Sequence, residues 1–430
     1  STQDLRALRA FALAENALGQ RRFEEARNLY QAAIDIDPGF ALAYMGVAKL
    51  HARVDEGRRA REAMQHALDL QDRLPPRERL YLKAWMAELE PGGWALEHWR
   101  TLAKVYPDSF AGLSNTSWYL LQANQFSEAE PYARAAAVPQ DPLRLYPLIH
   151  LVRIQIAANQ PQLAAETLAQ AQVLRGRDDA DETGVDVLVA QGKYAKAAQL
   201  LPQIRANDAL QQRMKLRAQL LLAATQRDCA AMQQAVRDDA SAPALVDFQV
   251  QQRLQHASVA ALCPSADRAE LQAIAALLHP LLEQRDDPML HARGLQWLAL
   301  VHLAQRQGQF ELAKRWLDEQ RPLLRSLRSP VADRWLRIVS AVDELQMQRP
   351  EAARALIEPM LDGSEPVQAH VVLLLALRAQ GNEAAVRREQ AWLSQHRGQA
   401  IAEVTAMQVW QPLNVHDVST WASPAAAGAP

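Results

Sequence analysis

The sequence contains few of the residues that build disulfide-rich folds, sandwiches or nucleic-acid-binding surfaces. Of its 430 residues, Cys 2 is too few for a disulfide framework, and Gly 16 is sparse for folds that need frequent left-handed turns. Lys+Arg 47 nearly balance Asp+Glu 49, so the formal charge is -2 and no basic surface for phosphate backbones is indicated. No apolar run approaches the roughly 18 residues of a membrane span. We therefore predict no nucleic-acid partner and no direct membrane insertion of this chain.

The residues that are present are typical of a packed helical protein. Hydrophobic residues make up 49% of the chain and charged residues 22%, which is the composition of a globular protein rather than a disordered one. The sequence has no glycine-rich phosphate loop, no metalloprotease-type histidine pair and no nucleophile elbow. We therefore predict a protein that is not an enzyme and that has no cofactor and no metal. An enzyme that uses His256, Asp267 or Glu270 is the alternative.

A repeat runs through the first half of the chain. Ala26, Tyr30 and Ala33 recur at helical spacing, and Asp37-Pro38 follows them, as expected for the second helix of a hairpin that ends before a proline. The alanine at the equivalent position returns in each unit, with spacings of 34, 35, 34, 35 and 33 residues. These alanines are Ala26, Ala60, Ala95, Ala129, Ala164 and Ala197.

These residues resemble the tetratricopeptide repeat (TPR) family, whose unit of about 34 residues has small residues where two helices cross. The resemblance covers about Leu5 to Ile204. It implies an all-α, right-handed α-solenoid of helix-turn-helix hairpins, in which each hairpin packs on its neighbours and the stack forms a concave surface.

The repeat pattern changes along the chain, and it divides the sequence into four expected parts. Residues 1–205 form an N-terminal array of about six repeats, and residues 206–265 form an irregular helical joint. Residues 266–400 form a degenerate TPR-like array. Residues 401–430 form a C-terminal extension, and we expect its end to be disordered because it lacks both periodicities.

The resemblance also implies a function and a set of site residues. In the family, polar and aromatic residues on the first helix of each repeat face the concave groove, so we expect a scaffold that binds a peptide segment or a partner protein there. The Lys and Asn set with which some members clamp a C-terminal carboxylate is not reproduced here. Solvation alone is the alternative explanation for about half of the expected site residues. These residues are Lys49, Arg53, Arg77, Asn115, Trp118, Gln122, Tyr146, His150 and Arg153.

A short segment suggests an alternative function. Residues 72–80 resemble a linker found in repeat regions attached to bacterial signalling proteins. The chain would then be the sensory or regulatory TPR region of a larger protein with a kinase, a cyclase or a transcriptional regulator. A cytoplasmic location is slightly favoured, and a periplasmic one applies if an upstream membrane span is missing. The partner's identity and the oligomeric state stay open.

The sequence contains one pair of residues that could form a disulfide and one pair that could bind a metal. Cys229 and Cys263 are 34 residues apart, but equivalent sites on stacked repeats lie about 10 Å apart, beyond the Cα limit of about 7 Å for a disulfide. We therefore predict buried free thiols. His291 and His302 are 11 residues apart and can share a helix face, yet we expect them at the surface or in the groove rather than on a metal.

Overall fold

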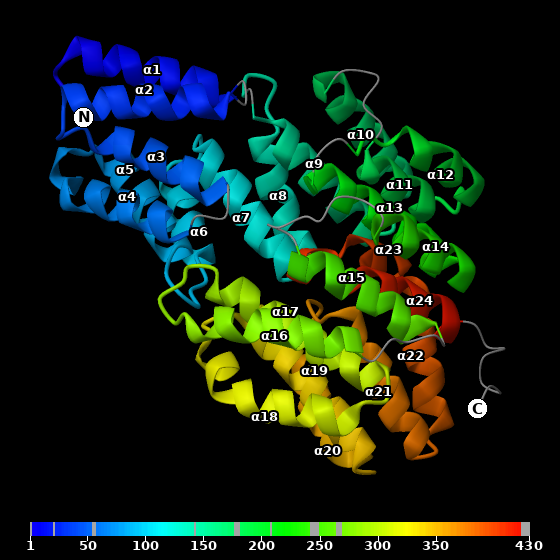
Figure 1. The fold of residues 1–430 in the computed structure, drawn as a ribbon. Helices are drawn as coiled ribbons and strands as arrows, with labels where there is room; N and C mark the ends of the chain where they lie inside the picture. The colour runs from blue at the N-terminus through cyan, green and yellow to red at the C-terminus, as the bar shows by residue number, and fades with distance from the viewer. Residues whose placement is uncertain are drawn as a thin grey trace.

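The computed structural model describes residues 2–19, 22–53, 57–141, 143–175, 181–206, 209–240, 249–263 and 269–422. Over these residues the chain is all-α, and consecutive helices pack as antiparallel hairpins (Figure 1). Within the same residues no helix is long and apolar enough to cross a membrane. The expected all-α solenoid of stacked hairpins is therefore confirmed.

The first twelve helices form six hairpins, and the repeat pattern explains how they pack. All six repeated alanines have no exposed surface, as expected where two helices cross. The close approach is visible at Gly112, where an added Cβ would lie 2.8 Å from the backbone nitrogen of Ala103. The twelve helices are α1 (Leu5–Gly19), α2 (Phe23–Ile36), α3 (Ala41–Arg53), α4 (Gly57–Asp69), α5 (Pro76–Glu88), α6 (Leu96–Val105), α7 (Phe110–Gln122), α8 (Phe126–Ala136), α9 (Leu145–Ala157), α10 (Pro161–Arg175), α11 (Glu182–Ala190) and α12 (Tyr194–Leu200).

One backbone conformation recurs at the turns inside the hairpins, in both halves of the chain. The second residue after the first helix adopts a positive φ, which closes the helix with a left-handed cap. Glycine adopts this conformation without strain, and asparagine tolerates it. These residues are Asn124 (φ 58), Asn159 (φ 55), Gly192 (φ 71), Arg227 (φ 56), Gly308 (φ 71), Gln348 (φ 57) and Gly381 (φ 68).

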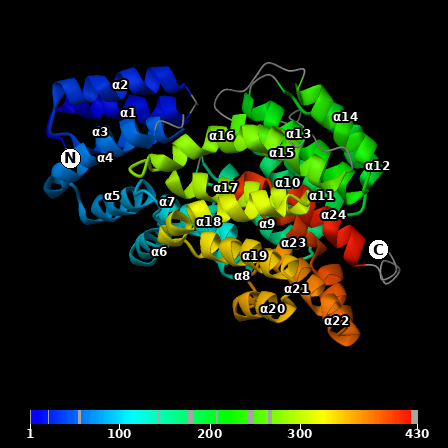
Figure 2. The same ribbon diagram turned by 60° about the horizontal axis from the view of Figure 1, so that its bottom comes forward.

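The second half of the chain returns to the first half (Figures 1 and 2). The backbone nitrogen of Arg328 donates to the carbonyl of Gly92 at 2.9 Å, and Arg58 reaches Gln284 at 3.2 Å. The later helices are α13 (Ala209–Thr225), α14 (Cys229–Ala240), α15 (Gln249–Leu262), α16 (Ala269–Glu283), α17 (Leu290–Arg306), α18 (Phe310–Ser326), α19 (Pro330–Gln346), α20 (Pro350–Ile357), α21 (Val367–Ala379), α22 (Glu383–Gln395), α23 (Arg397–Ala402) and α24 (Gln411–Trp421).

The last two helices lie inside the curve of the solenoid, against α9, α11 and α13. Gly398 makes this possible, because any Cβ there would overlap the carbonyl oxygen of Ile156. Between the two helices, Trp410 is 1% exposed and stacks on Trp335, with ring centroids 3.5 Å apart. This end of the chain is therefore part of the core. The eight residues after Ala422, for which disorder was expected, lie outside the described residues.

The prediction of two free thiols is wrong. Cys229 and Cys263 form a disulfide, with Cα atoms 5.7 Å apart. The prediction assumed equivalent positions on stacked repeats, whereas Cys229 begins α14 and Cys263 directly follows the end of α15. Because these neighbouring helices run antiparallel, the first residue of one lies beside the last residue of the next. The disulfide therefore ties the start of α14 to the end of α15.

The two histidines are also placed differently from the expectation of a surface or groove position. His302 is 1% exposed and packs against Trp335 and Trp410. His291 is half-buried and lies beside Trp94, with ring centroids 5.6 Å apart. Burial lowers the pKa of each histidine to about 4. No group of three potential metal ligands occurs among the residues that the structure describes.

Candidate functional site: the inner face and the C-terminal segment

The inner face of the solenoid is built by the first helices of successive hairpins. We define the C-terminal segment as residues 397–421, which contain α23 and α24. This segment contacts α9, α11, α13, α15 and α21, and α17 contacts the short turn between α23 and α24. The later part of the inner face therefore already holds a polypeptide segment, and that segment belongs to the same chain.

A buried ion pair holds the middle of the segment. Arg217 on α13 donates to both carboxylate oxygens of Asp186 on α11, at 2.9 and 3.1 Å. The same guanidinium donates to Gln411 of the C-terminal segment at 2.8 Å. The side chains of Arg217 and Asp186 are only 3% and 1% exposed, so the bidentate contact between them offsets the cost of burying two charges. Gln411 is thus bound by Arg217, which the neighbouring hairpin holds in place through Asp186.

A second ion pair holds the end of the segment. Arg306, the last residue of α17, donates to both oxygens of Asp417 at 2.5 and 2.8 Å. Gln368 on α21 adds bonds of 2.9 Å to Asp417 and 3.1 Å to Asn414. Burial is the largest single influence and opposes ionisation of this carboxyl, but the charge of Arg306 and the hydrogen bonds from Arg306, His416 and Gln368 together outweigh it, so the pKa of Asp417 is held well below its usual range.

Glu403 joins four parts of the chain at the start of the turn after α23. Its Oε1 accepts from the backbone nitrogen of Val367 at 2.8 Å, from Gln399 at 3.0 Å and from Asn124 at 3.2 Å. Its Oε2 accepts from Asn414 at 2.7 Å. No lysine, arginine or histidine in the described ranges forms an ion pair with it. Burial therefore dominates over the hydrogen bonds and raises the pKa of Glu403 to about 7.

The structure brings together six of the predicted site residues, on α7 and α9. The ring of Trp118 stacks on that of His150, with centroids 5.5 Å apart and an interplanar angle of 26°. Tyr146 is 45% exposed, whereas Arg153 is 8% exposed. Burial and the charge of Arg153 lower the pKa of His150 to about 3, so its imidazole is neutral. We call the six residues the α7–α9 strip: Asn115, Trp118, Gln122, Tyr146, His150 and Arg153.

The other predicted site residues lie on earlier hairpins. Lys49 forms an ion pair of 2.8 Å with Glu15 of the preceding hairpin. Arg77 binds Asp108 at 3.0 Å, and its guanidinium lies 5.5 Å from the centre of the Tyr106 ring. The side chain of Arg53 lies outside the described residues. The structure therefore does not join Lys49 or Arg77 to the α7–α9 strip.

Sequence reasoning missed the residues of the C-terminal segment that bind the inner face. Gln411, Asn414 and Asp417 are three residues apart from one another, so they lie near one face of a single helix. Pro412 at the start of that helix is a second signal, because proline is favoured in the first turn.

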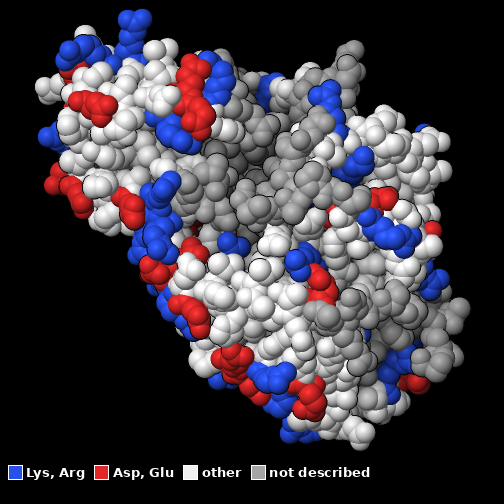
Figure 3. All heavy atoms as spheres, viewed as in Figure 1, with Lys and Arg blue, Asp and Glu red and all other residues white. Residues whose placement is uncertain are grey.

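The visible surface gives no sign of a site for a highly charged partner. On the face shown in Figure 3, acidic and basic side chains of the described residues are interspersed, and no large area carries one sign. This distribution agrees with the near-zero net charge of the sequence.

Comparisons with known proteins give a low-identity similarity to solved helical structures. The chain is similar to the TPR domain of P58(IPK), with 12% identity and a TM-score of 0.20 over 88% of this chain and 99% of that chain. It is also similar to a chain of the Naa15/Naa10 complex bound to HypK-THB, with 12% identity and a TM-score of 0.26 over 99% of this chain and 70% of that chain. TM-scores of this size support no argument about function. No family model and no curated protein matches the sequence.

Proposed function

We propose that this chain is a non-enzymatic scaffold that binds a peptide segment or a partner protein on the α7–α9 strip of its inner face. The observation that carries this proposal is the binding of the C-terminal segment to the later part of the same face. There, Arg217 on α13, Arg306 on α17 and Gln368 on α21 bind carboxylate and amide groups of a polypeptide. The face is thus suited to hold a polypeptide through side-chain hydrogen bonds.

The α7–α9 strip has the features of a continuation of this binding surface. It offers the Trp118 ring for apolar contact, and amide groups at Asn115 and Gln122 for main-chain hydrogen bonds. The C-terminal segment reaches the end of the strip, where Thr405 donates to the carbonyl of Gln122 at 3.4 Å. A partner on the strip would therefore lie next to the segment rather than replace it.

Partner capture followed by cross-linking tests the proposal. The wild-type chain and the Trp118→Ala variant are used to isolate partners from the native organism, and the cross-linked residues are identified by mass spectrometry. We expect cross-links on α7 and α9, and a loss of capture in Trp118→Ala. Trp421→Ala is the matched control, because Trp421 is also half-buried but contacts Arg378 at the far end of the chain. Capture that is equal in both variants, or cross-links confined to the outer helices, would contradict the proposal.

As an alternative, we propose that the chain is the sensory or regulatory region of a larger bacterial signalling protein. The resemblance at residues 72–80 supports this alternative. The disulfide between Cys229 and Cys263 favours an oxidising compartment such as the periplasm over the cytoplasm, because reduced thiols prevail in the cytosol.

A further inference from the structure

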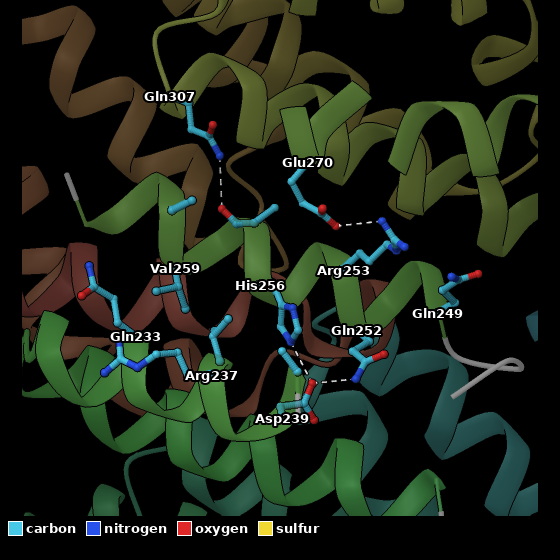
Figure 4. A pocket seen from close by; sticks show the side chains of 14 residues that line it. Gln233, Arg237, Asp239, Gln249, Gln252, Arg253, His256, Val259, Glu270 and Gln307 are labelled. Atoms are coloured by element: carbon cyan, nitrogen blue, oxygen red, sulfur yellow. Dashed lines mark hydrogen bonds and ion pairs between the residues drawn. The ribbon is translucent and has the colours of Figure 1, made fainter. Parts of the chain in front are cut away.

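A cavity of about 690 Å³ lies between α14 and α15, and it extends to Glu270 on α16 and to Gln307 (Figure 4). Its volume falls within the roughly 300–1,000 Å³ that is usual for sites of small organic ligands. Part of its wall is apolar, from Val236 on α14 and from Val259 and the adjacent alanine on α15. The disulfide fixes the far end of the two helices and so helps to keep their separation constant.

A buried carboxylate lines this cavity. The side chain of Asp239 is 7% exposed. Its Oδ2 accepts two hydrogen bonds, from Gln252 at 2.6 Å and from Nε2 of His256 at 2.7 Å, and Figure 4 shows both side chains converging on it. Gln252 and His256 are four residues apart on α15, so they lie on one face of that helix. The carboxylate is therefore held in one position before any ligand arrives.

The basic side chain paired with Asp239 is His256, which carries a charge only when its imidazole is protonated. Within the described part of the chain, no lysine or arginine forms an ion pair with Asp239. Arg253 is engaged with Glu270 at 3.2 Å, and Arg237 donates to Gln234. Asp239 also lies in the last turn of α14, where the helix dipole adds negative potential. A buried carboxylate in this position is stabilised by a cation that comes from outside.

We propose that this cavity binds the cationic end of an aliphatic ligand, a guanidinium or a primary ammonium group, with Asp239 as its counter-ion. Both donors, Gln252 and His256, bind Oδ2, and among the described residues no hydrogen bond reaches Oδ1 of the carboxylate. The valine and alanine side chains on α14 and α15 contact the aliphatic part of the ligand. The cation is either that of a free small amine or guanidine, or that of a lysine or arginine side chain in a peptide. The site is separate from the α7–α9 strip, so it does not rest on the function proposed above.

Calorimetric titration with n-butylguanidinium tests the site on the full chain. We expect saturable binding, no binding of the neutral isostere n-butylurea, and affinity at least about tenfold weaker in Asp239→Asn, because that change removes the counter-ion. Asp238→Asn is the matched control, since Asp238 lies in the same helical turn and carries the same charge, but it is exposed and does not line the cavity. It should bind as the wild type does.

Three results would overturn the proposal: no binding of n-butylguanidinium, equal binding of n-butylurea, or equal affinity in Asp239→Asn and Asp238→Asn. If Asp239→Asn does not fold, the NMR resonances of the His256 imidazole in the wild-type chain test the site instead. They must shift on titration with n-butylguanidinium, and an unchanged spectrum refutes the site. A parallel titration with N-acetyl-arginine methylamide distinguishes a peptide side chain from a free small molecule as the source of the cation. Tighter binding of this compound favours a peptide side chain, and tighter binding of n-butylguanidinium favours a small molecule.

Discussion

Replacing Glu403 by glutamine should change how the stability of the protein depends on pH. The pKa of Glu403 is raised from 4.5 to about 7 in the folded chain, chiefly by burial. Between these two values the folded state binds the proton more tightly than the unfolded state does. The free energy of unfolding therefore falls as pH rises through this window. Glutamine cannot ionise, so the Glu403→Gln variant loses this contribution.

The magnitude follows from the difference between the two pKa values. A difference of roughly 2.5 pKa units corresponds to about 3 kcal/mol. Glu403 is only 2% exposed, so solvent screening does not reduce this figure much. A protonated carboxyl and a glutamine both lose an acceptor for Asn414, so this loss is shared by the two proteins below the folded pKa of Glu403. Only the part that depends on pH measures the burial of the charge.

Urea unfolding at several pH values measures this difference. The wild-type free energy of unfolding is subtracted from that of Glu403→Gln at each pH. This subtraction removes the contributions of other groups, such as His150 and His302. Both histidines are neutral in the folded chain, but they gain a proton when unfolded below about pH 6.5. The difference should rise in favour of glutamine by about 3 kcal/mol from about pH 4.5 to about pH 8. Glu130→Gln, on the surface of α8, should give no such rise. A flat curve for Glu403→Gln would refute the assignment of a buried, unpaired carboxylate.

Two further changes test the packing of the hairpins. Replacing both Cys229 and Cys263 by alanine should lower the free energy of unfolding by up to about 4 kcal/mol. The reason is that the disulfide closes a loop of 34 residues and so reduces the conformational entropy of the unfolded chain. Urea unfolding of the variant and of the oxidised wild type measures this loss. Replacing Ala129 by leucine should cost about 1–3 kcal/mol by overpacking a helix crossing that has no exposed surface, which calorimetric melting would detect; an unchanged melting temperature would mean that the repeat register is wrong.

The hairpin fold was predictable because each repeat contacts mainly its neighbours. The spacing of the alanines at 26, 60, 95, 129, 164 and 197 records a local requirement for close helix packing, and all six are buried. The proximity of Trp118 and His150 followed for the same reason, since α7 and α9 are the first helices of adjacent repeats. Interactions between neighbouring repeats leave a periodic trace in the sequence.

Contacts between distant parts of the chain leave no such trace. The bond between Asn124 and Glu403 joins residues 279 positions apart, and that between Arg217 and Gln411 joins residues 194 apart. Nothing in the repeat pattern specifies these partners. The disulfide was missed for a different reason: the spacing of 34 residues equals one repeat, but Cys229 and Cys263 lie at opposite ends of their helices.

The C-terminal segment also explains why polar residues on the inner face can be so deeply buried. Asp186, Arg217 and Gln368 are at most 3% exposed, and each would carry a large desolvation cost without a partner. Asp186 and Arg217 pair with each other, and the segment supplies Gln411 to Arg217 and Asp417 to Gln368, so the later hairpins and the segment stabilise each other. Displacing the segment would remove these hydrogen bonds, would leave Arg306 without Asp417 and would expose the stacked Trp410. A ligand is therefore more easily accommodated on the α7–α9 strip, where Tyr146 and the half-buried Trp118 remain accessible without any rearrangement of the core.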